Sequence, residues 1–106
     1  HSGIYNDTIL RHKKAMKQTE KTLLKIRHDI TNIRYTDLFN LCLEYFGKPR
    51  QSGSSHAIFK TPWQGDPRIN IQNSKGKAKA YQVKQVLAAI EKLQKSAVYK
   101  EDQNEY

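Results

Sequence analysis

The chain has 106 residues, of which 37% are hydrophobic. This is enough for one domain with one modest core, and it argues against wholesale disorder. Nineteen Lys and Arg against ten Asp and Glu give a formal net charge of +9, which favours a polyanionic partner such as nucleic acid over a surface that is basic only for solubility. No apolar run approaches the roughly 20 residues that span a bilayer, and the N-terminus lacks the apolar stretch of a signal peptide. We therefore expect a cytoplasmic protein with no membrane partner.

The first predicted helix runs from Asp7 to about His28, because this stretch holds no Pro or Gly and Asp7 or Thr8 can cap its first turn. Apolar residues recur on one face every seven positions, at Ile9, Met16, Leu23 and Ile30. This stripe predicts packing against the domain or against a partner. We treat residues 1–30 as an N-terminal helical extension. In one alternative the chain is an interaction subunit that docks a partner on this stripe.

A second helix is predicted after a linker from Asp29 to Tyr35. Thr36 offers its hydroxyl as the cap, and Gly47 with the nearby Pro49 ends the helix. The only cysteine, Cys42, falls within the apolar stripe of this helix. We therefore interpret it as a small buried hydrophobic residue and not as a catalytic thiol.

Three short strands are predicted next, over 48–52, 56–61 and 68–73. Pro49 confines the first to a sheet edge, and the turn-rich segment 62–67 joins the other two as a hairpin. Ile69 and Ile71 alternate with polar residues, as in a strand that buries one face. The strand that begins at His56 is ambiguous, because one phase exposes His56 while the opposite phase buries it.

A basic loop over 74–79 leads into the last predicted helix, from Ala80 to Lys95. A polar tail over 96–106 is expected to fray, with an extension of the helix through Val98 and Tyr99 as the alternative. Five apolar residues at helical spacing should cover the sheet: Val83, Val86, Leu87, Ile90 and Leu93. The pattern predicts an α+β fold with a three-stranded antiparallel sheet, helices on one of its faces and an extra N-terminal helix. The main domain would span residues 31–95.

His56 is the candidate catalytic residue. An imidazole can accept a proton from a ribose 2′-hydroxyl and donate one to the leaving 5′-oxygen, which would cleave RNA without a metal. The sequence has no His-Glu-x-x-His pattern, so we predict neither a metal site nor a cofactor. A structural role for His56 remains the alternative from this residue alone.

Basic and amide side chains around His56 are the candidate RNA-binding residues. The basic loop before a helix N-terminus suits phosphate, Lys60 is a candidate to stabilise the charged transition state, and two amides lie on the partner strand. The predicted set is Lys60, Lys75, Lys77, Lys79, Asn70 and Gln72. Trp63 and Tyr81 are further aromatic candidates for stacking on bases, with packing as the alternative.

Four segments, taken in this order, resemble the HicA family of toxin mRNA interferases: Asn32–Leu38, Ser55–Phe59, Ile69–Gln72 and Gly76–Val83. The resemblance implies a double-stranded-RNA-binding-like fold, mRNA cleavage that uses His56, and neutralisation by a HicB-type antitoxin. The chain departs from the family where Ser54-Ser55 precedes His56 in place of Gly-Ser, and where Ala80 stands in place of a common proline. A non-catalytic RNA-binding module is the other open alternative.

Overall fold

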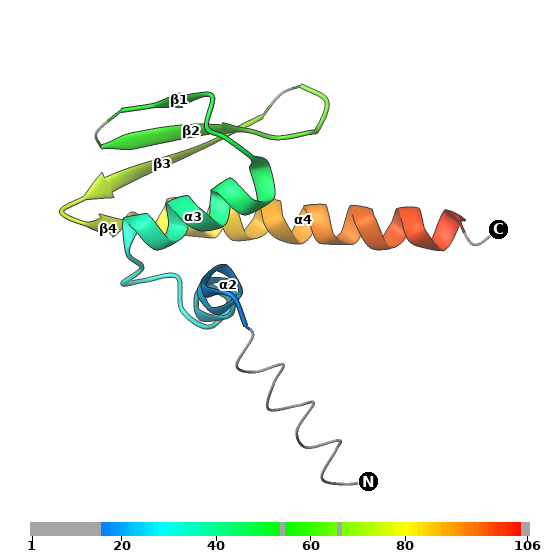
Figure 1. Cartoon of the computed structure of the whole chain (residues 1–106), viewed down its shortest axis with the longest axis horizontal. Coiled ribbons are helices and arrows are strands. Elements are labelled where there is room, and N and C mark those ends of the chain that lie inside the picture. Colours follow the sequence, from blue (N-terminus) through cyan, green and yellow to red (C-terminus); the bar gives the residue numbers. More distant parts are fainter. Residues whose placement is uncertain (1–15, 54, 66, 105–106) are drawn as a thin grey trace, which may run out of the picture.

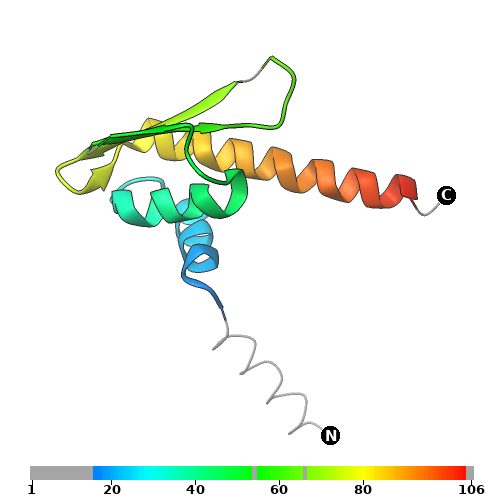
Figure 2. The same cartoon turned by 45° about the horizontal axis from the view of Figure 1, so that its top comes forward.

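A computed structural model of the chain describes residues 16–53, 55–65 and 67–104. In the described part, three helices and four strands form an α+β fold. The sheet is the upper layer in Figure 1, α3 and α4 lie beneath it, and α2 packs on their far side (Figures 1 and 2). No helix in the described ranges is long and apolar enough to cross a membrane.

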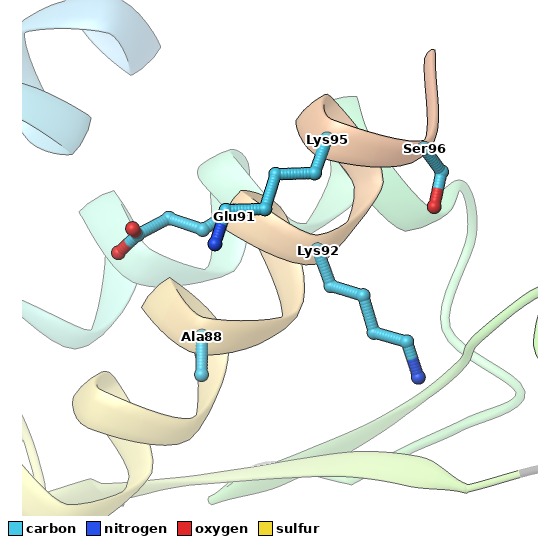
Figure 3. Close-up of a pocket in the computed structure, with 5 residues that line it drawn as sticks. All are labelled: Ala88, Glu91, Lys92, Lys95 and Ser96. Carbon is cyan, nitrogen blue, oxygen red and sulfur yellow. The ribbon is translucent and has the colours of Figure 1, made fainter. Parts of the chain in front are cut away.

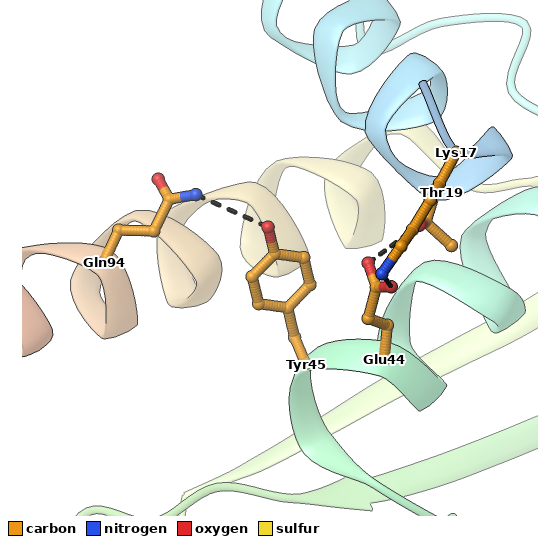
Figure 4. Close-up of polar contacts among 5 residues, drawn as sticks. All are labelled: Lys17, Thr19, Glu44, Tyr45 and Gln94. Atoms are coloured by element: carbon orange, nitrogen blue, oxygen red, sulfur yellow. Dashed lines mark hydrogen bonds and ion pairs between the residues drawn. The ribbon is translucent and has the colours of Figure 1, made fainter. Parts of the chain in front are cut away.

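Helix α2 spans Gln18–His28, the second half of the first predicted helix; residues 7–15 of that prediction, with Ile9, lie outside the described residues. Leu23 and Ile26 are buried in the common core. Polar contacts join the three helices: Thr19 of α2 donates to Glu44 of α3 at 2.7 Å, and Gln94 of α4 donates to Tyr45 of α3 at 3.4 Å (Figure 4). The stripe residue Leu23 is therefore used for internal packing and is not free to dock a partner.

Helix α3 spans Tyr35–Phe46, so the prediction that Thr36 caps it was wrong. The residue before the helix, Arg34, is extended because its neighbours pair with a strand: the Tyr35 N–H donates to the Gly76 carbonyl and the Ala78 N–H donates to the Ile33 carbonyl. This pairing sets the start of the helix one residue earlier than the hydroxyl cap would. The predicted end is confirmed, since Gly47 follows the last turn with a φ of +81°.

The sheet is antiparallel with the order β1-β2-β3-β4, so the prediction of three strands was wrong. The strands are Gln51–Ser52, His56–Lys60, Arg68–Ser74 and Lys77–Ala78.

The fourth strand comes from the segment expected to be a loop. Lys75 and Gly76 have φ values of +53° and +88°, the positive φ at both central residues that a two-residue hairpin turn needs. Asn73 Oδ1 accepts a hydrogen bond from the Gly76 N–H at 2.6 Å, which stabilises this turn.

The alternation of β2 and β3 is resolved. Ala57, Phe59, Ile69 and Ile71 point into the core, whereas His56 and the residues alternating with it face the other side. Helices α3 and α4 cover only the first of these faces (Figure 2). The predicted placement of helices on one face of the sheet is therefore confirmed.

Helix α4 spans Ala80–Asn104, so the tail predicted to fray is helical as far as Asn104. The segment contains no Pro or Gly and is rich in Ala, Gln, Glu and Lys, which are good helix formers. Val83, Val86 and Ile90 are fully buried as predicted, while Leu87 and Leu93 are half-buried.

Cys42 lies in the core, as predicted. Burial raises the pKa of its thiol to about 12, so the thiolate needed for nucleophilic chemistry does not form near neutral pH.

Candidate functional site

His56 opens strand β2 on the solvent face of the sheet. It pairs with Gln72 of β3, and its side chain is exposed. Its neighbours determine which way the His56 side chain points, because Ala57 and Phe59 are buried in the core and alternate residues of a strand face opposite sides. The sequence left two orientations open, and the folded sheet selects the one that exposes the imidazole.

Gly53 gives the imidazole its position over the β1–β2 turn. The Gly53 N–H donates to the His56 carbonyl at 2.8 Å, which closes the turn. A Cβ added at Gly53 would lie 3.1 Å from His56 Cε1 and 3.4 Å from Nδ1, closer than atoms normally pack. A side chain at position 53 would therefore require the exposed His56 ring to shift by a few tenths of an ångström.

A polar hollow surrounds His56, with a volume of about 260 Å³. Its walls come from the start of β2, the end of β3 and the residue before α4: Ser55, His56, Gln72, Asn73, Ser74 and Lys79. The Asn73 N–H donates to the Ser55 carbonyl at 2.7 Å, and this hydrogen bond extends the β2–β3 pairing one residue beyond His56, to the edge of the hollow. The start of β2, the end of β3 and the residue before α4 thus bring His56 and Lys79 to the lining of one hollow.

Lys79 is the predicted basic residue that shares the hollow with His56. It directly precedes α4, and its carbonyl accepts the N–H groups of Gln82 and Val83 at 3.0 Å. The positive end of the α4 dipole therefore lies at the residue that lines the hollow, and both this end and the lysine charge favour an anion.

Lys75 and Lys77 flank the hollow on the β3–β4 hairpin. Lys75 sits in the turn, and Lys77 pairs with Ser74, one of the residues lining the hollow. Both lysines are exposed. The segment predicted to be a basic loop is therefore a hairpin, and Lys77 is paired with a residue of the hollow that His56 lines.

Lys60 and Asn70 lie elsewhere on the open face. Lys60 is at the far end of β2 from His56, about 13 Å away along the strand at ~3.3 Å per residue. It lines a different hollow, together with Tyr45, Phe46, Thr61 and Pro62. Asn70 pairs with Ile58, which is midway along β2 between His56 and Lys60. Of these basic residues Lys79, and not Lys60, lines the hollow with His56.

Gln82 is a residue that the sequence reasoning missed. It is 3% exposed, and its Oε1 accepts the backbone N–H of Gln72 at 2.7 Å. Its Nε2 lies 3.4 Å from Gln72 Oε1 and 3.3 Å from the Tyr81 hydroxyl. The available signal was a lone polar residue next to Val83, at a position that faces the sheet.

Another hollow lies along α4, where Figure 3 shows Ala88, Glu91, Lys92, Lys95 and Ser96. Lys92 Nζ is 4.3 Å from the centroid of the Trp63 ring. Trp63 is half-buried against the core, so it serves as a packing residue covered by a cation. None of the residues that line the hollow at His56 lines this third hollow.

Among the described residues, no three His, Cys, Asp or Glu side chains gather closely enough to hold a metal ion. Comparisons of the chain with protein-family models, with curated proteins and with solved structures found no match. The candidate site is therefore defined by its own geometry.

Proposed function

We propose that this chain is an endoribonuclease of the HicA type, which cleaves mRNA in the cytoplasm by metal-independent acid/base chemistry. One observation carries the proposal: His56 and Lys79 line the same open, polar hollow on the uncovered face of the sheet. The sheet with helices on one face also agrees with the double-stranded-RNA-binding-like fold that the resemblance implies. A HicB-type antitoxin would neutralise the protein by covering this face.

In the proposed mechanism the His56 imidazole removes the proton of a ribose 2′-hydroxyl. The oxygen attacks the adjacent phosphorus, the bond to the 5′-oxygen breaks, and a 2′,3′-cyclic phosphate forms. The leaving 5′-oxygen takes a proton from the imidazolium or from water. The Lys79 ammonium group stabilises the negative charge that grows on the phosphate oxygens in this step.

The hairpin lysines have a separate role in the proposal. Lys75 and Lys77 hold phosphates of the flanking nucleotides, which positions the strand without reading its sequence. Gln72 lines the hollow with His56 and contacts the nucleotide there. Lys60 and Asn70 contact RNA farther along the sheet.

The test is an RNA cleavage assay in EDTA with wild type and His56→Ala. Acid/base catalysis contributes about 10²- to 10⁴-fold to such rates, so the variant should lose activity by that factor. His28→Ala is the matched control, because His28 is an exposed histidine on α2; it should cleave like wild type. An RNA with a 2′-deoxy group at the cleaved position should resist cleavage. Full activity of His56→Ala, with circular dichroism unchanged, would rule the assignment out.

A non-catalytic RNA-binding module is the second candidate. It is favoured by the absence, among the described residues, of any carboxylate hydrogen-bonded to the His56 imidazole, since such a partner commonly orients a general base. This candidate predicts salt-sensitive RNA binding by wild type with no cyclic-phosphate product after prolonged incubation.

A further inference from the structure

Tyr81 is the exposed aromatic residue closest in sequence to the candidate site. It lies in the first turn of α4, two residues after Lys79, and is 57% exposed. Leu24 of α2, at 52%, is the other large apolar side chain exposed to this degree in the described part. Within the described ranges, ring–ring contacts join Tyr35 to Phe39 and Phe39 to Phe59, and Tyr81 makes none.

The hydroxyl end of Tyr81 is anchored to the hollow through a buried amide. Gln82 Nε2 donates to the Tyr81 hydroxyl at 3.3 Å and lies 3.4 Å from Gln72 Oε1. Gln82 is itself fixed, because its Oε1 accepts the Gln72 backbone N–H at 2.7 Å. The same amide thus holds the tyrosine hydroxyl and the side chain that lines the hollow beside His56.

We propose that Tyr81 is the stacking platform for an unpaired nucleobase of the strand whose phosphate lies between His56 and Lys79. This inference rests on the proposed function and narrows its substrate to single-stranded RNA. A ring held at its hydroxyl loses little conformational freedom on binding, so more of the stacking energy appears as affinity. Base–aromatic stacking is tolerant of sequence, because every base has a π-face.

Duplex RNA does not meet this requirement. Bases inside an A-form helix are already stacked and paired, and their faces are closed to a side chain. The lysines around the hollow would still attract the backbone of a duplex, so charge alone does not discriminate between the two forms. In the proposal, Tyr81 provides that discrimination.

The test measures affinity and cleavage separately. Binding is followed by fluorescence anisotropy of a labelled single-stranded oligonucleotide with 2′-O-methyl groups, which cannot be cleaved through the 2′-oxygen. A removed base–aromatic stack corresponds to about a 5- to 150-fold loss of affinity. Tyr81→Ala and Tyr81→Leu should both show this loss, whereas Tyr81→Phe, which keeps the ring but lacks the hydroxyl that Gln82 holds, should lose less affinity than either.

Two controls complete the design. Leu24→Ala removes the other exposed apolar side chain, on α2, and should bind like wild type. A 2′-O-methyl duplex should bind equally to wild type and Tyr81→Ala, because the paired bases of a duplex cannot stack on the side chain of residue 81 in either protein. Thermal melting confirms that each variant is folded.

Equal single-strand affinity of Tyr81→Ala and wild type would overturn the inference, as would a Tyr81→Leu variant that binds like Tyr81→Phe. If His56→Ala abolishes cleavage while Tyr81→Ala binds normally, the inference fails and the proposed function stands. If wild type never cleaves but Tyr81→Ala loses affinity for the single strand, the nuclease assignment fails and the stacking role stands.

Discussion

The two faces of strands β2 and β3 are built from alternate residues of the same segments, but one face is buried in the core and the other is open to solvent. On the covered face Ala57, Phe59 and Ile71 are fully buried, and Ile69 is 8% exposed. On the open face His56, Lys60 and Asn70 are exposed. Because successive side chains point to opposite faces, each of these strands contributes buried residues to the core and exposed residues to the open face.

The largest contrast between the faces is expected in stability. Phe59→Ala should lower the free energy of unfolding by about 3–5 kcal/mol, as removal of a buried phenyl ring usually does. Its ring packs edge-on against Phe39 at 5.6 Å between centroids. Ile58→Ala, one residue away and half-exposed, should cost less than about 1 kcal/mol. Urea unfolding measures both, and equal losses would contradict the separation of the faces.

A smaller effect on stability is expected at Gln82, a buried residue that hydrogen-bonds the backbone of Gln72 on β3. Gln82→Leu removes the acceptor of the Gln72 N–H and should cost about 1–3 kcal/mol, the penalty of a buried donor left unsatisfied. Hydrogen exchange of the Gln72 amide should accelerate. Gln85→Leu is the control, because Gln85 is exposed on the same helix; unchanged urea midpoints in both variants would remove the role given to Gln82.

The salt dependence of RNA binding gives the smallest expected effect. Each phosphate contact on a single strand contributes about 0.7 to the slope of log K against log salt. Replacing Lys77 and Lys79 by Gln should therefore lower the slope by about 1.4, and affinity should fall about sevenfold less between 50 and 200 mM salt.

The control removes the same charge from the opposite side of the molecule. Lys21 and Lys25 are exposed on α2, and their change to Gln should leave the slope almost unaltered. Equal slopes for the two double variants would indicate that only net charge matters, and the placement of the RNA on the open face would be wrong.

Much of the fold followed from local patterns. Period-two alternation at Ile69 and Ile71 identified β3, helical spacing of Val83, Val86 and Ile90 identified α4, and Gly47 marked the end of α3. The errors arose where a long-range contact overrides a local signal. Thr36 lost its predicted capping role because residues 33–35 pair with β4, and the Lys75–Lys79 loop became a hairpin because its Lys75-Gly76 turn closes on β3.

The large positive charge, the α+β pattern and a histidine behind a glycine at the start of a strand can all be read from the residues alone. The fold was needed to show that His56 is exposed, that it shares a hollow with Lys79, and that the Gln82 side chain is buried. The physical reason is that a strand's alternation fixes which residues share a face, whereas packing against α3 and α4 selects the face that goes inside. Ala57 and Phe59 fill the core, and His56 is left facing solvent.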